Sequence, residues 1–187
     1  ETNVNRGIYA FLNNSDSVLK DSKVRKAVQV GIDTSKVRKE MEFIDKLDFP
    51  VLNQFVDVKD LNIPQYDLNQ AQKILNEAGW KKNHEGILEK DGKKAVLNKK
   101  AAEEIQNQLK KLGFDVKLTI INKDDKTGAF IQSILQPRNY SILVYEIDLG
   151  ADPDIYAFWH SSQIGQKGLN FSNYSDVVAD DLLLNSR

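Results

Sequence analysis

The sequence DPDIYAFWHSSQ occupies Asp152–Gln163, and the sequence NFSNY follows it at Asn170–Tyr174. In the first segment two carboxylates flank a proline, and three aromatic side chains come directly behind them. Pro153 fixes its own φ and biases the residue before it toward extended backbone, so a rigid turn is predicted here. A rigid turn that presents carboxylates and aromatic rings suits a site for a polar, chain-like ligand.

Several of these side chains also have a purely structural interpretation. Asp154 is predicted to cap a helix that starts near Ile155, since aspartate is a favoured N-cap residue. Asp152 is either a turn former or a ligand contact. The aromatic side chains pack in a core or stack on a ligand, and the sequence leaves both open: Tyr156, Phe158 and Trp159.

The composition describes a folded, water-compatible chain and excludes several classes of protein. The 187 residues carry a net charge of -1, so no electrostatic field favours nucleic acid or an anionic membrane. No apolar run approaches the roughly 20 residues that a membrane span needs. There is no cysteine, which excludes thiolate chemistry and disulfides.

Metal, cofactor and catalytic sites are not indicated either. The two histidines, His84 and His160, lie too far apart in sequence to suggest a metal site, and His160 is predicted to be structural. The sequence contains no nucleophile elbow, phosphate-binding glycine loop or H-E-x-x-H motif. We therefore expect no cofactor and no enzymatic activity.

Periodicity predicts alternating strands and helices along the chain. Strand patterns occur at Arg6–Asn13, Phe114–Ile120 and Ile142–Tyr145, the last of which is expected to be buried on both sides. Helix patterns occur at 22–31, 35–41, 67–78, 99–112, 125–136 and 177–185. This alternation predicts an α/β fold with a mixed sheet flanked by helices.

Local signals fix several boundaries. The predicted N-caps are Asp21 or Ser22, Ser35, Asp67 and Asp176. Gly79 is predicted to end the third helix, and the turn residues on either side of Ile87 and Leu88 predict a small hairpin. Residues 44–66 carry few periodic signals and are expected to be irregular.

Four blocks of sequence, taken in order, resemble those of one protein family. They are DSKVRKA…GID at 21–33, YD…EAGW at 66–80, AEEIQ…LKKLGFDV at 102–116, and the DPD…WHSSQ…NFSNY segment with the closing DxLL and Arg. This order is similar to that of the family 5 extracellular solute-binding proteins, which are the oligopeptide- and dipeptide-binding receptors of ABC importers.

The resemblance implies one lobe of a two-lobed, periplasmic-binding-protein-like clamp of class II. We expect residues 1–187 to be a single C-terminal lobe, with the N-terminal lobe absent from this fragment. The implied partners are a peptide ligand and the membrane subunits of an ABC permease, with no nucleic acid. A monomer is expected, placed outside the cytoplasm in the periplasm or lipid-anchored at the cell surface.

The resemblance also implies the ligand-binding residues. An acid near the DPD segment is expected to pair with the α-ammonium group of the peptide, and Asp148 and Asp152 are the candidates. Many relatives carry a tryptophan a few residues before DPD, and here Tyr145 or Ile147 occupies that position, depending on the alignment. Tyr156 is the candidate for stacking on the ligand.

Two points depart from the family pattern or stay open. Residues 93–100 are several positions shorter than the corresponding family segment. The fold also permits another solute, such as an oligosaccharide, a nickel complex or haem. The same pattern is compatible with the sensor domain of a cytoplasmic transcription regulator, or with a degenerate lobe that serves as an interaction surface.

Overall fold

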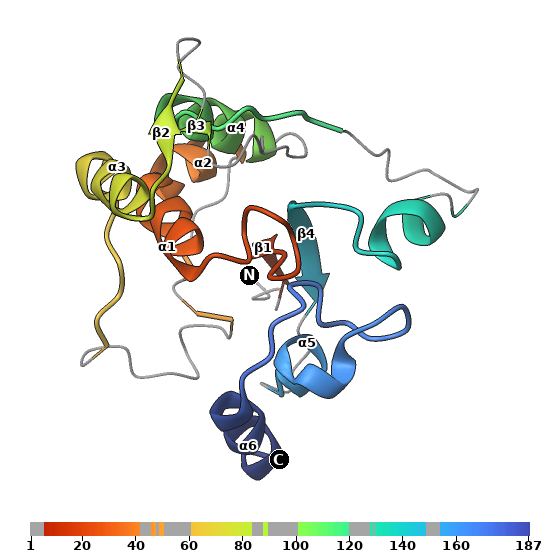
Figure 1. Ribbon diagram of the computed structural model, residues 1–187. Helices are drawn as coiled ribbons and strands as arrows, with labels where there is room; N and C mark the ends of the chain where they lie inside the picture. Colours follow the sequence, from red (N-terminus) through yellow and green to blue (C-terminus); the bar gives the residue numbers. More distant parts are fainter. Residues whose placement is uncertain are drawn as a thin grey trace.

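A computed structural model describes residues 6–41, 46–47, 49–50, 61–83, 88–89, 101–119, 128, 130–148 and 154–187 (Figure 1). Several predicted features lie outside these residues. They are the candidate acid Asp152, most of the irregular stretch at 44–66, the hairpin turn at 84–87 and the shortened segment at 93–100.

Two strands that are far apart in the sequence form the centre of the fold. β1, Arg6–Leu12, pairs antiparallel with β4, Ile142–Asp148, in a register that runs from Arg6 opposite Asp148 to Leu12 opposite Ile142. β1 matches the predicted strand. β4 continues three residues beyond the predicted end at Tyr145 because its backbone stays paired with β1 over its whole length.

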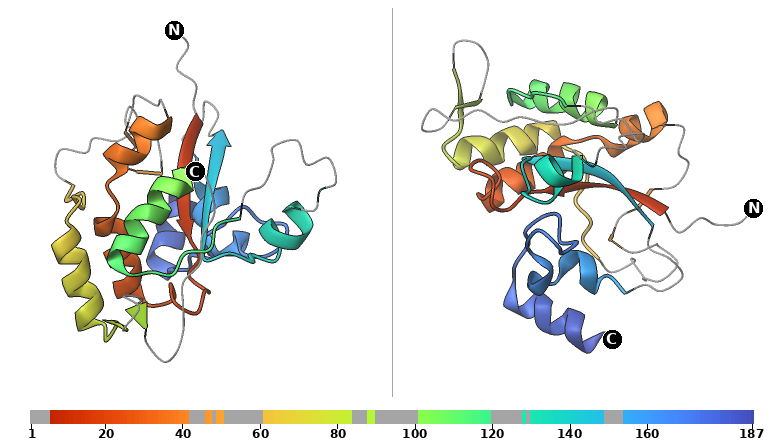
Figure 2. Two further views of the ribbon diagram at one scale, coloured as in Figure 1. Left: turned by 90° about the horizontal axis from the view of Figure 1, so that it is seen from above. Right: turned by 90° about the vertical axis from the view of Figure 1, so that its right-hand side faces the viewer.

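The β1–β4 ladder separates two apolar clusters. Alternate residues of a strand point to opposite faces, so Leu143 and Ile147 share one face with Phe11, while Ile142 and Val144 lie on the other. The first face packs against Phe171 in a small, aromatic cluster, and the second packs against the larger core formed by the helices. Figures 1 and 2 show α1–α4 on one side of the ladder and α5 and α6 on the other.

One expectation for β4 is wrong. The strand is predicted to be buried on both sides, yet Tyr145 is 37% exposed. The Tyr145 side chain lies on the same face of the strand as Leu143 and Ile147. Those two side chains are buried in the small cluster, whereas Tyr145 between them is only partly covered.

The helices of the larger core begin where their caps predict. α1, Ser22–Gly31, is capped by Asp21, whose carboxylate accepts a hydrogen bond from the Lys23 N–H at 2.9 Å. α3, Leu68–Glu77, is capped by Asp67 through the Gln70 N–H at 2.8 Å. Gly79 follows α3 with φ of 84°, in the left-handed region that glycine adopts without strain. α4 spans Ala101–Leu112.

The cap of α2 differs from the prediction. α2 spans Thr34–Met41, so Ser35 lies inside the helix instead of capping it. The carboxylate of Asp33 accepts hydrogen bonds from the Ser35 N–H at 3.0 Å and the Ser35 hydroxyl at 2.5 Å. The Ser35 hydroxyl lowers the pKa of Asp33, in spite of the opposing effect of burial. A carboxylate one residue before the helix meets the free N–H groups better than the serine within it.

The predicted hairpin is confirmed, and the predicted strand at 114–120 is not. β2, Lys81–Lys82, pairs antiparallel with β3, Leu88–Glu89. Residues 114–119 form no strand pair among the described residues, although Phe114 and Val116 are buried and the residue between them is exposed. The Gln106 side-chain amide donates to the Val116 carbonyl at 2.7 Å and so takes the place of one ladder hydrogen bond.

The helix predicted at 125–136 is reduced to one turn of π-helix among the described residues, Ile131–Leu135 (η2). Gly128, with φ of 67°, stands just before it in a conformation that a right-handed helix does not use. The Gln132 N–H bonds to the Gly128 carbonyl, so helical bonding begins there. Residues 120–127 and 129 lie outside the described part of the chain.

The C-terminal part contains three short helices. They are α5, Tyr156–Trp159, the 3₁₀ turn η3, Ser161–Gln163, and α6, Val177–Asn185. Asp176 caps α6 as predicted, because its carboxylate accepts from the Ala179 N–H at 2.9 Å. α6 is apolar but exposed, with Val177 83% and Leu182 66% accessible.

Close packing of three helices at Gly31 generates a stability prediction. A Cβ atom at this position would clash with Leu112 Cδ1 and lie 3.1 Å from the Cβ of Ala71. We expect Gly31→Ala to lower the free energy of unfolding by about 1–3 kcal/mol, as overpacking a core does. Urea denaturation checks this value. Gln29→Ala, on the exposed side of α1, is the control and should change it by less than about 0.5 kcal/mol. Equal stabilities of the two variants would contradict the account.

Candidate ligand-binding site

The carboxyl end of β4 carries three of the five residues predicted to bind ligand. Tyr145, Ile147 and Asp148 lie within its last four positions, and Figure 1 shows that the strand points toward α5. The Tyr145 ring meets Phe171 edge-on at 5.7 Å between centroids and lies 6.3 Å from the Phe130 ring. These contacts fix the ring while leaving 37% of the residue accessible.

The other two residues of this strand end are placed differently. Ile147 is 6% exposed and packs in the small cluster with Phe11 and Phe171, so its side chain contributes to the core and is largely inaccessible to a ligand. The backbone of Asp148 pairs with Arg6 at the last position of the ladder. Only the backbone of Asp148 is described, and Asp152 lies outside the described residues, so the role of both acids stays a prediction.

Tyr156 begins α5 and is held by three groups. Its ring stacks on His160 with centroids 4.2 Å apart, and the Arg187 guanidinium lies 4.6 Å from its centroid. Its hydroxyl lies 3.1 Å from Ser162 Oγ. The ring is therefore set in a fixed orientation by one residue just after α5, one in η3 and one that follows α6.

The rest of the α5 turn follows the prediction with one difference. The Asp154 carboxylate accepts from the Tyr156 N–H at 2.8 Å, but α5 begins at Tyr156, so the N-cap position is Ile155 and Asp154 stands one residue before it. Phe158 and Trp159 pack against the small cluster, and the Trp159 ring lies 6.0 Å from that of Phe11. His160 has a structural role, since its Nδ1 accepts from the Ser162 N–H at 3.0 Å.

Sequence reasoning missed the polar hub that supports this turn. Asn170 is fully buried, and its side-chain amide donates to the carbonyls of Trp159, His160 and Tyr174 at 2.8–3.2 Å. Its Oδ1 accepts from the Ser172 hydroxyl at 3.0 Å. Asn170 is recognisable within NFSNY, but nothing local indicates that its amide nitrogen lies within hydrogen-bond distance of three separate carbonyls.

A second set of polar contacts that the sequence did not indicate joins the segment after β1 to residues 138–140 and to the C-terminal part of the chain. The Asn13 side chain donates to the carbonyls of Arg138 and Tyr140 at 3.2 and 2.9 Å, and accepts from the Asn173 amide at 3.0 Å. The guanidinium of Arg138, which is 8% exposed, donates to the carbonyls of Gly165 and Gly168 at 3.0 and 2.7 Å. Arg138 has φ of 55°, so this contact is made from a backbone conformation that non-glycine residues rarely adopt.

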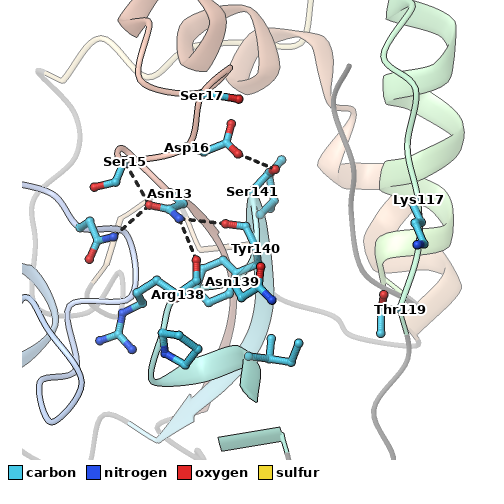
Figure 3. Close-up of a pocket in the computed structure, with 14 residues that line it drawn as sticks. Asn13, Ser15, Asp16, Ser17, Lys117, Thr119, Arg138, Asn139, Tyr140 and Ser141 are labelled. Carbon is cyan, nitrogen blue, oxygen red and sulfur yellow. Dashed lines mark hydrogen bonds between the residues drawn. The ribbon is translucent and has the colours of Figure 1, made fainter. Parts of the chain in front are cut away.

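A polar cavity of about 540 Å³ lies at the opposite end of β4 (Figure 3). Lys117 and Thr119 line one side of it, and Asn139–Ser141 line the other. The Asp16 carboxylate on its wall accepts from the Ser141 hydroxyl at 2.8 Å and from two backbone N–H groups. None of the five predicted ligand residues lines this cavity.

Neither a metal centre nor a membrane span is found in the part of the chain that the structure covers. No cluster of three or more histidine, cysteine, aspartate or glutamate side chains there could hold a metal ion. No helix in the same residues is long and apolar enough to cross a membrane.

Comparison with known sequences identifies the family. Residues 1–169 match the family described as "Bacterial extracellular solute-binding proteins, family 5 Middle". The chain belongs to this family.

Relatives within family 5 include peptide-binding proteins. The oligopeptide-binding protein AppA of Bacillus subtilis is 31% identical over 199 residues, which cover 96% of this chain and 35% of AppA. The structure of that protein in complex with a nonapeptide matches with a TM-score of 0.83 at 29% identity, over 98% of this chain and 39% of that one. This chain thus spans little more than a third of the length of these relatives.

More distant solved structures share the fold. DppA from Helicobacter pylori, in complex with peptide STSA, gives a TM-score of 0.80 at 22% identity over 97% of this chain and 35% of that one. NikZ from Campylobacter jejuni, in complex with Ni(L-His), gives 0.78 at 24% identity over 97% and 40%. The predicted α/β, periplasmic-binding-protein-like fold is confirmed by these matches.

A hydrogen bond to Phe171, whose ring contacts Tyr145, generates a second prediction. The Tyr140 hydroxyl donates to the Phe171 carbonyl at 2.8 Å. We expect Tyr140→Phe to cost about 1–2 kcal/mol of unfolding free energy at neutral pH, because the carbonyl loses its partner. Tyr66→Phe, at a residue that is 46% exposed, is the matched control and should cost little.

The same hydrogen bond should be sensitive to alkali. Burial raises the pKa of Tyr140 to about 12, while an unfolded tyrosine ionises near about 10. The contribution of Tyr140 to stability is therefore complete below a pH of about 10 and is lost as the pH rises toward about 12. Urea unfolding across this range should give a smaller alkaline loss for Tyr140→Phe than for the parent protein. An equal loss in both would contradict the assignment.

Proposed function

We propose that this chain is one lobe of a two-lobed receptor that captures oligopeptides and delivers them to an ABC permease. The observation that carries the proposal is the 31% identity with the oligopeptide-binding protein AppA across 96% of this chain. The proposal includes placement outside the cytoplasm, in the periplasm or at the cell surface. It further includes a monomeric state, no cofactor, no nucleic-acid partner and no enzymatic activity.

In this proposal the ligand lies along the carboxyl end of β4 and the segment that follows it. Tyr145 is the exposed ring there, on a strand whose partner β1 keeps it in place. Peptide ligands suit such a surface because an extended backbone can hydrogen-bond along it while side chains occupy adjacent space.

Asp148 or Asp152 would pair with the α-ammonium group of the peptide. A carboxylate and an ammonium group attract weakly in water, but strongly once a closing second lobe excludes solvent from the pair. The pairing would thus stabilise the closed state when the amino terminus of the peptide is correctly placed.

The proposed mechanism is hinge closure of the two lobes around the ligand. A ligand that contacts both lobes binds the closed state more tightly than the open one and therefore shifts the population toward it. Because this chain would supply one side of the clamp only, residues 1–187 alone should bind peptide more weakly than the full-length protein does.

The identity of the ligand can be measured on the full-length protein. Native mass spectrometry after gentle purification should show a ladder of masses that resolves into mixed peptides. A single sugar, haem or metal-complex mass would keep the fold and overturn the peptide proposal. Isothermal titration with peptide STSA and with a nonapeptide would then give affinities.

Recognition of the amino terminus generates a third prediction. N-acetylation of the titrated peptide removes the ammonium charge, and we expect binding to weaken by at least about 30-fold because a buried acid would lose its partner. Equal affinity for both forms would contradict the proposed pairing.

The responsible acid can be assigned with variants of the full-length protein. Either Asp148→Asn or Asp152→Asn should abolish the preference for the free amino terminus, and the other should retain it. Asp115→Asn changes an exposed carboxylate next to the buried Phe114 and is the control, which should leave the preference unchanged.

A further inference from the structure

α6 is attached to the rest of the described chain by polar contacts more than by burial. None of its side chains is buried, and Val178 and Leu184 are 69% and 57% exposed. Apolar packing therefore contributes little to fixing its position. α6 does contact α5 directly, and Figure 2 shows the two helices together on the far side of the ladder.

Asp180 makes the first of the two contacts that join these helices. Its carboxylate accepts a hydrogen bond from the Ser161 N–H at 2.8 Å and another from the Ser161 hydroxyl at 2.5 Å. These hydrogen bonds lower the pKa of Asp180, so the carboxylate is charged at neutral pH. Hydrogen bonds to a charged acceptor are stronger than those between neutral groups. Ser161, which begins η3, donates both of them.

Arg187 makes the second contact, just beyond the end of α6. Its Nε lies 3.0 Å from the Asp154 carboxylate, and its guanidinium lies 4.6 Å from the centroid of the Tyr156 ring. The other oxygen of Asp154 accepts the Tyr156 N–H at 2.8 Å. One carboxylate thus binds the first N–H group of α5 and Arg187 at the same time.

The α5 turn needs such external contacts because it is short. A four-residue helix cannot hold its own conformation, since the cost of forming the first turn is not recovered by further turns. Asp180 holds the turn after its end, at Ser161, and Arg187 holds it before its start, at Asp154. The orientation of Tyr156 between these two points therefore depends on α6 in addition to the Asn170 hub and the packing of Phe158 and Trp159.

We propose that α6 positions the ligand site: Asp180 and Arg187 hold the α5 turn so that Tyr156 stands in the orientation that binds peptide. Asp180 and Arg187 are positioning residues and touch no ligand themselves. The inference rests on the proposed peptide-binding function, and it adds residues that the sequence motif alone does not assign a role.

The test uses four variants of the full-length protein. Arg187→Ala removes one contact, and Asp180→Asn weakens the other because it removes the charge and leaves a single acceptor oxygen. Arg187→Lys keeps the positive charge but loses the planar group that lies over Tyr156. Asp181→Asn is the matched control, because it changes the neighbouring carboxylate on the same helix at an exposed position.

Hydrogen exchange of the ligand-free protein gives the first readout. We expect faster exchange within residues 156–163 in Asp180→Asn and Arg187→Ala, with β1 and α1 unchanged. Unchanged exchange in both variants would overturn the inference, since the turn would then hold its conformation without α6.

Titration with peptide STSA or a nonapeptide gives the second readout. Binding should weaken by about three- to tenfold in Arg187→Ala, the loss expected from a partly exposed ion pair together with a cation–π contact. Asp180→Asn should also weaken binding, Arg187→Lys should recover part of the loss, and Asp181→Asn should match the parent protein.

The two readouts separate the inference from the function on which it rests. Faster exchange with unchanged affinity in both variants would overturn the positioning role while leaving peptide binding intact. A parent protein that binds no peptide, in the titration or by mass spectrometry, would overturn the proposed function itself and the positioning role with it.

Discussion

Backbone hydrogen bonds between β1 and β4 join two segments that are far apart in the sequence. The ladder that they form separates two apolar clusters, one on each of its faces. Closing so long a loop costs chain entropy, which burial on both faces of the ladder must offset. On one face Ile142 and Val144 meet the helical core, and on the other Leu143 and Ile147 meet the aromatic cluster. A register slip of one residue would exchange these two sets, so both clusters fix the register.

The ladder also gives the molecule two functionally different ends. Where β1 ends and β4 begins, the polar groups around Asn13 and Asp16 are used to bind other parts of the chain. Where β4 ends, Tyr145 keeps an accessible ring and the strand points toward α5. The polar hub at Asn170 and the contacts from α6 stabilise that second end from outside the sheet. Ligand binding is therefore expected where the chain leaves the ladder.

Much of the fold could be predicted from sequence wherever the cause is local. Asp21, Asp67 and Asp176 cap their helices as expected, because an N-cap depends only on the next three residues. The family could be recognised from four ordered blocks. Asp154 also binds the first residue of α5, although it stands one position before the N-cap.

The failures have long-range causes. The segment after Phe114 has the alternation of a strand, but the Gln106 amide binds its backbone. The hub at Asn170 and the contact of Asp180 with Ser161 depend on loops that meet only in the folded chain. No spacing rule connects such residues, and a single asparagine or aspartate in a turn has many possible partners.

The most direct test of this account asks at which end of β4 a peptide lies. Ile142 and Ile147 are on the same strand, about 17 Å apart, and Ile134 lines the polar cavity near Ile142. Methyl NMR of the full-length protein with a nitroxide-labelled peptide would compare them. The account predicts that the Ile147 methyl signal broadens most strongly. Stronger broadening of Ile134 and Ile142 would place the ligand at the polar cavity and contradict it.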